Sequence, residues 1–99
     1  MRLDKWLKIS RLIKRRTVAK MACDQGRVLI NDRIAKSSAE VEADAIIHIE
    51  LGSRALTVKV LEIPLKTPQA SDASKLYEII EEIKRPPEIL EWLPSDEDW

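Results

Sequence analysis

The chain has 99 residues, of which 44% are hydrophobic, and this suits one small packed domain because two halves would each have a marginal core. A single cysteine excludes an internal disulfide and fits a reducing compartment, and no apolar run approaches the roughly 18 residues of a membrane span. The 17 basic and 17 acidic residues cancel overall, but residues 1–36 hold eleven Lys and Arg against three Asp, a net charge of +8. Residues 37–99 hold six Lys and Arg against fourteen Asp and Glu, a net charge of −8. We expect a cytoplasmic protein without a membrane segment.

The first expected element is a helix. Apolar residues recur three or four positions apart from residue 3 to residue 13, and neither Gly nor Pro interrupts them. We expect this helix to end near residue 15 or 16, which places Lys8, Arg11 and Arg15 along one side. Thr17 is a reasonable N-cap for a second helix, and Gly26 lies where a left-handed C-cap is needed.

Short runs with β-strand character follow. "RVLIN" and "RIA" surround Asn31-Asp32, which is typical of a tight turn, and "AIIHIEL" and "ALTVKVLEI" are the clearest strands, joined by "GSR". After a loop over residues 64–70, we expect a third helix from about Asp72, because Leu76, Ile79, Ile80 and Ile83 have helical spacing, and Pro86-Pro87 ends it. One further turn is expected around Leu90 and Trp92, followed by a frayed acidic end.

The predicted fold class is therefore α+β. Two N-terminal helices pack on a small antiparallel sheet, and a C-terminal helix is added. Residues 1–63 form the main domain, and residues 64–99 contribute a loop, a covering helix and an acidic tail to the same compact unit.

The segment "SRLIKRRTVAK" combines five cations with aliphatic residues. One interpretation is an ordinary solvated helix face. However, crowded like charges destabilise a fold, and an anionic partner would offset that cost. A membrane surface or a transit peptide is a further alternative, but removing these residues would remove a core helix. The predicted strands lack the aromatic pair that sheet-based readers of single-stranded RNA use, so the pattern favours recognition of a structured nucleic acid through its phosphates and shape.

Catalysis is not expected. His48 is a single histidine in a strand, Cys23 has no histidine near it in sequence, and Asp4, Asp24 and Asp32 are better explained as a first-turn anion, a solvated helix residue and a turn residue. The sequence has no phosphate-binding loop, dinucleotide fingerprint, nucleophile elbow or zinc-ligand spacing. We expect neither a cofactor nor a metal.

The segments "RLDKWL", "SR", "KRR", "QGRVLIN" and "AKSS" together resemble the S-four domain, a fold in which two helices on a small sheet grip structured RNA. The opening "MRLDKWLKISRLIKRRTVAK" and the later "ASKLYEII" are more closely similar to the bacterial RqcP group. This resemblance implies binding to rRNA and tRNA on an obstructed large ribosomal subunit. It also implies cooperation with an RqcH-type factor in C-terminal alanine tailing. We expect a monomer. The RNA-binding residues that it implies are Arg2, Lys5, Lys8, Arg11, Arg15, Arg16, Lys20 and Arg27. Lys14, in the same basic segment, completes the expected RNA-binding set.

Three alternatives stay open. A heat-shock group of S-four proteins also binds the obstructed subunit, but it has a longer basic C-terminus, whereas the ending here is acidic. The other two are an accessory to RNA modification and a protein-interaction module formed by the acidic half. The chain also departs from the family at two turns, with Asn31-Asp32 in place of Asn-Gly and Ala43-Asp44 in place of Gly-Asp.

Overall fold

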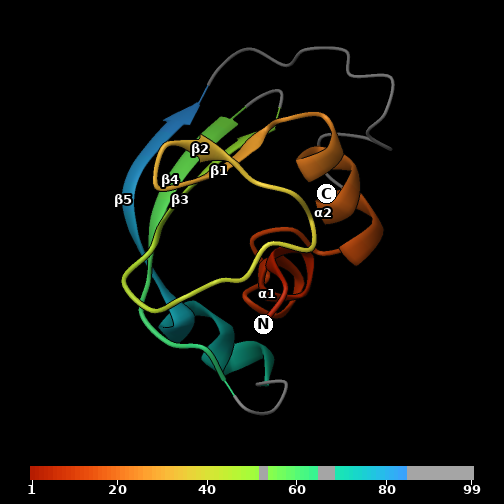
Figure 1. Cartoon of the computed structure of the whole chain (residues 1–99). Coiled ribbons are helices and arrows are strands. Elements are labelled where there is room, and N and C mark those ends of the chain that lie inside the picture. The colour runs from red at the N-terminus through yellow and green to blue at the C-terminus, as the bar shows by residue number, and fades with distance from the viewer. Residues whose placement is uncertain (52–53, 65–68, 85–99) are drawn as a thin grey trace.

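A computed structural model of the chain describes residues 1–51, 54–64 and 69–84. Two helices lie against one face of a curved five-stranded sheet, on the right in Figure 1. All neighbouring strands are antiparallel, in the order β2-β1-β3-β4-β5. The elements are α1 (Leu3–Ile9), α2 (Arg16–Asp24), β1 (Val28–Ile30), β2 (Arg33–Ile34), β3 (Ile46–Leu51), β4 (Arg54–Val60), the 3-10 helix η1 (Ala70–Leu76) and β5 (Tyr77–Lys84). The α+β class and the two helices on an antiparallel sheet are confirmed, whereas the division at residue 63 stays a prediction.

The core lies between the helices and the sheet. Successive side chains of a strand point to opposite faces, and alternate residues of β3 and β4 are buried against α1 and α2. Trp6 is fully buried among them, and its Nε1 donates a hydrogen bond to the carbonyl of Glu62, 3.3 Å away, just beyond β4. This contact ties α1 to the sheet. The buried strand residues are Ile47, Ile49, Leu51, Leu56, Val58 and Val60.

The first helix is shorter than expected. α1 ends at Ile9, and Arg11 adopts a left-handed φ of 60°, so the prediction of one helix to residue 15 or 16 is wrong. Ser10 Oγ donates to the carbonyl of Leu7 at 3.1 Å, and the amide of Ile13 donates to the same carbonyl at 3.2 Å. These bonds satisfy the helix end. The turn that follows buries both Leu12 and Ile13.

The second helix begins with Arg15 as its N-cap residue and not with Thr17, which lies inside the helix. Its C-terminal end was predicted correctly. Gly26 has a φ of 70°, its amide donates to Cys23, and the amide of Arg27 donates to Ala22, both at 3.0 Å. This is a Schellman motif, in which glycine occupies the left-handed position without a Cβ penalty.

The predicted hairpin turn is also confirmed. Ile30 pairs with Arg33, and the two residues between them, Asn31 and Asp32, have φ values of 50° and 67°. Two left-handed residues are what a type I′ turn requires, and Asn and Asp tolerate that region better than most side chains. At the second departure from the family, the left-handed residue is Asp44 (φ 69°), so Ala43 avoids this strain.

The predicted C-terminal helix is wrong. Residues 70–76 form a 3-10 helix, and residues 77–84 form β5, which pairs with β4 along its whole length. Thr57 faces Glu81 and Val58 faces Ile79, so Ile80 is the extra residue of a β-bulge. The bulge interrupts the strand alternation, so the apolar residues of this strand do not follow a period of two, and their spacing in the sequence resembles that of a helix. Leu90 and Trp92, where a further turn was expected, lie outside the described residues.

Candidate nucleic-acid interface

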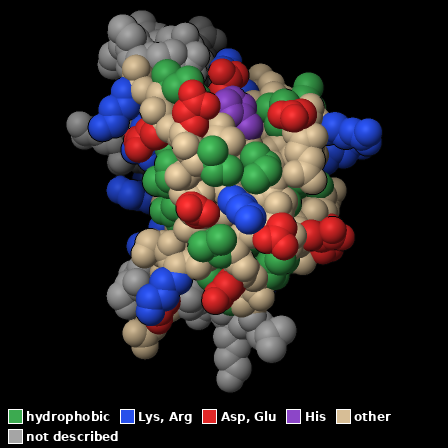
Figure 2. Space-filling view, turned by 90° about the vertical axis from the view of Figure 1, so that its left-hand side faces the viewer, with side chains coloured by type: hydrophobic (Ala, Val, Ile, Leu, Met, Phe, Trp, Pro, Cys, Tyr) green, Lys and Arg blue, Asp and Glu red, His purple; other side chains and the backbone are tan. Residues whose placement is uncertain are grey.

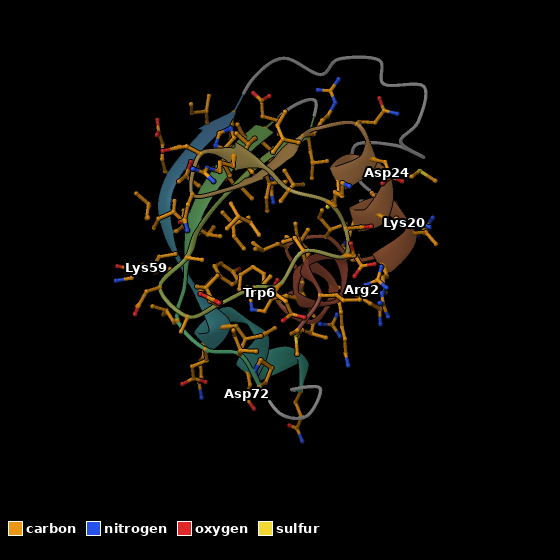
Figure 3. The ribbon with its side chains drawn as sticks, viewed as in Figure 1. Arg2, Trp6, Lys20, Asp24, Lys59 and Asp72 are labelled. Atoms are coloured by element: carbon orange, nitrogen blue, oxygen red, sulfur yellow. The ribbon has the colours of Figure 1, made fainter. Side chains whose placement is uncertain are left out.

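Eight of the nine predicted RNA-binding side chains are exposed, and they come from one continuous stretch of structure. α1, the turn after it and the first turns of α2 carry them: Arg2, Lys5, Lys8, Arg11, Lys14, Arg15, Arg16 and Lys20. We call this set the basic surface. Figure 3 shows Arg2 and Lys20 on the same side of the molecule, away from the sheet. Arg27 is partly buried and follows the other end of α2, a helix about 12 Å long from Arg16 to Asp24 at 1.5 Å per residue, so it lies apart from the cations at the start of that helix.

The backbone around Arg2 is held by a distant segment of the chain. The amide of Leu3 donates to the carbonyl of Ala39 at 2.8 Å, and the amide of Asp4 donates to the carbonyl of Ser37 at 3.2 Å. Arg2 itself forms a short antiparallel bridge with Glu40. Residues 37–40, at the end of the "AKSS" segment and just after it, therefore position the start of α1, and through it the first arginine of the basic surface.

The turn between the helices projects its cations outward. Leu12 and Ile13 are buried on the inner side, whereas Arg11, Lys14 and Arg15 are exposed. The left-handed conformation of Arg11 reverses the chain at this point. Apolar residues threaded between cations thus serve as the anchor of the turn.

Asp4 is the residue that the sequence reasoning missed. It lies in the first turn of α1, as expected, but its side chain is only 4% exposed and lies between Arg2 and Arg16. Oδ1 lies 3.3 Å from the Nε of Arg2, and Oδ2 lies 3.4 Å from the Nε of Arg16. The available signal was that Asp4 is the single acidic residue among the first 23.

The opposite face of the sheet has a different character. Figure 2 shows acidic and basic side chains interspersed with apolar ones over this face. His48 lies here with its Nδ1 3.0 Å from Thr57 Oγ1, and Lys59 lies 3.7 Å from Asp44. In Figure 3, Lys59 is on the far side of the sheet from Arg2 and Lys20. A polyanion that approaches the basic surface therefore meets the helices and not the sheet.

Cys23 does not have the properties of a reactive thiol. It is buried in α2, and burial, followed by the negative charges of Asp4 and Asp24, raises its pKa to about 12. Because the thiolate is the nucleophile, this thiol is unreactive near neutral pH.

None of the helices in the described part of the chain has the length and the apolar character of a membrane span.

Comparison with known proteins agrees with this geometry. A family model described as the S4 domain matches residues 1–47. The chain is 49% identical over 84 residues to the "RQC P-site tRNA stabilizing factor" of Streptococcus pneumoniae, covering 85% of this chain and 94% of that protein. It is 45% identical over 84 residues to the protein of the same name from Bacillus subtilis, covering 85% and 96%.

A solved structure is similar as well. The trimeric heat shock protein 15 of Vibrio cholerae superposes with a TM-score of 0.73 at 34% identity, covering 80% of each chain. The identity to the pneumococcal and Bacillus proteins is higher and extends over nearly their full length. The chain is therefore an S4 domain protein that belongs to the family of RQC P-site tRNA stabilizing factors.

Proposed function

We propose that this protein is a non-enzymatic factor that binds rRNA and P-site tRNA on the large ribosomal subunit through its basic surface. The observation that carries the proposal is the grouping of eight exposed cations on α1, α2 and their connecting turn, with one buried carboxylate among them. Arg and Lys at this density suit a phosphate backbone, and arginine can hold a phosphate with two hydrogen bonds. The names of the related proteins support tRNA as one of the ligands.

The biological setting follows from the same relationship. A factor that stabilises P-site tRNA during ribosome-associated quality control acts on large subunits that still carry a peptidyl-tRNA. The proposal extends to cooperation with an RqcH-type factor in C-terminal alanine tailing, to a monomeric state and to action in the cytoplasm. Arg27 is included as a peripheral contact, because it follows the far end of α2.

The direct test is co-sedimentation of purified protein with large subunits that carry P-site tRNA. We expect Arg16→Ala to abolish co-sedimentation while the circular dichroism spectrum stays native, because Arg16 is half-exposed at the start of α2 and shares the carboxylate of Asp4 with Arg2. Lys59→Ala, which removes a cation from the opposite face, is the matched control and should co-sediment like the unaltered protein. Undiminished co-sedimentation of Arg16→Ala would exclude Arg16 from the site.

A second candidate is a heat-shock-type role in recycling the subunit, and the structural similarity to heat shock protein 15 favours it. A reconstituted tailing reaction separates the two functions. If the protein supports tailing, its addition to subunits, an RqcH-type factor and alanyl-tRNA should raise alanine incorporation. If incorporation is unchanged while binding persists, the recycling role is the better description.

A further inference from the structure

Asp4 bridges two elements that are far apart along the chain. It lies in the first turn of α1, and its carboxylate contacts Arg16 at the start of α2 and Arg2 just before α1. The amide of Lys5 donates to Asp4 Oδ1 at 2.8 Å, which holds the carboxylate in one orientation. A buried carboxylate between two arginines would serve packing alone if both arginine side chains were also buried, but these side chains are 49% and 46% exposed.

The geometry determines which part of each arginine stays available. Nε and Nη2 of Arg2 lie 3.3 and 3.5 Å from the carboxylate oxygens, and Nε and Nη2 of Arg16 both lie 3.4 Å from them. Asp4 therefore occupies the same edge of both guanidinium groups. Each group has a second edge, formed by Nη1 and Nη2, whose spacing matches two oxygens of a phosphate. Within the described residues, Nη1 of neither arginine has a hydrogen-bond partner.

We propose that Asp4 is a positioning residue of the RNA site, which holds Arg2 and Arg16 side by side with their second edges turned toward RNA phosphates. The inference rests on the proposed function, because it assigns the arrangement of two arginines in that surface. Asp4 offsets the repulsion between the two guanidinium groups and orders both side chains before RNA arrives. Binding then loses less conformational entropy, since each flexible side chain immobilised at an interface reduces affinity.

The positioning role and the net charge of the surface predict opposite changes in RNA affinity when the Asp4 carboxylate is removed. Removing an acid from a basic surface raises its net charge by one, and charge alone would tighten RNA binding. Loss of a positioning residue weakens it. We expect Asp4→Asn to bind large subunits carrying P-site tRNA about tenfold more weakly, as the ordering of two long side chains implies. Asp24→Asn is the matched control, because Asp24 is an exposed acid on α2 that contacts no arginine within the described residues, and it should bind at least as tightly as the unaltered protein.

The affinities are compared at about 0.15 M potassium chloride, where exposed charges are screened beyond about 8 Å. If Asp4→Asn binds large subunits as tightly as the unaltered protein does, while Arg16→Ala does not bind them, the positioning role is overturned and the proposed function stands. If Arg16→Ala also binds normally, Arg16 lies outside the site and the positioning role is overturned; the proposed function itself fails only if the unaltered protein does not bind large subunits that carry P-site tRNA. A double-mutant cycle measures whether Asp4 acts on RNA binding through Arg16. A purely structural role of Asp4 would weaken binding equally with and without Arg16. In the Arg16→Ala background, read at low salt, Asp4→Asn should weaken the residual binding by clearly less than tenfold, and an undiminished effect would contradict the coupling.

A measurement on the unaltered protein keeps the inference testable even if Asp4→Asn fails to fold. In ¹H–¹⁵N spectra of the free protein near neutral pH, the Nε–H signals of Arg2 and Arg16 should be sharp and protected from solvent exchange. Arg2→Lys and Arg16→Lys assign these two signals. Nε–H signals that exchange as fast as those of Arg15, which is exposed, would show that Asp4 does not order the pair and would overturn the proposal.

Discussion

Salt should weaken binding of this protein to the large subunit steeply, and the structure sets the size of the effect. The basic surface has eight exposed cations, and two of them share the charge of Asp4. If about six phosphates are neutralised, the logarithm of affinity falls with the logarithm of salt concentration with a slope near −5, at roughly −0.7 to −0.9 per contact. Between about 0.05 and 0.2 M potassium chloride, this slope corresponds to roughly a thousandfold loss of affinity.

A single substitution sharpens the test. Arg15 is exposed, and within the described residues it forms no ion pair, so Arg15→Gln should make the slope shallower by roughly 0.8 with little change in stability. Lys59→Gln on the opposite face removes the same charge and should leave the slope unchanged. Fluorescence polarisation of dye-labelled protein, titrated with subunits at four salt concentrations, gives all three slopes. A slope flatter than about −2 for the unaltered protein, or equal effects of the two substitutions, would refute anchoring by the basic surface.

Two further predictions concern stability and reactivity. Arg11→Gly and Arg11→Ala remove the same charge, but only glycine relieves the φ of 60°, so Arg11→Gly should be more stable by about 1 kcal/mol in denaturant unfolding while both weaken RNA binding equally. Equal stabilities would contradict the left-handed turn. Cys23, with its pKa raised from 9.0 to about 12, should resist iodoacetamide near pH 8 unless the protein unfolds. Its protonated thiol stabilises the fold below pH 9, and this contribution should be lost as the pH rises from about 9 to 12; a flat thermal-stability profile over that window would contradict it.

Several features of the fold could be predicted because their causes are local. Gly26 ends α2 through bonds within six residues, and Asn31-Asp32 form a hairpin turn from two left-handed residues. The strands β3 and β4 alternate between buried and partly exposed residues over five or more positions. In each case a short window of sequence contains the residues that determine the conformation.

The end of α1 and the whole of β5 could not be predicted in this way. The segment of residues 76–83 has helical apolar spacing, yet three β-branched isoleucines and an available edge on β4 make it a strand with a bulge at Ile80. That edge is supplied by residues 17 to 30 positions earlier, from Val60 paired with Tyr77 to Arg54 paired with Lys84. Periodicity within a segment contains no information about such a partner.

The sequence by itself determined that the cations are concentrated in residues 1–36, that aliphatic residues anchor them, and that two helices precede a sheet. The tertiary structure alone decided that eight of the nine predicted cations share one surface, that Ser37 and Ala39 hold the start of α1, and that a buried carboxylate joins Arg2 to Arg16. Charge and periodicity are properties of residues and short windows. Ion pairs and strand pairing depend on which distant segments of the chain come into contact, and the packing of the whole core determines those contacts.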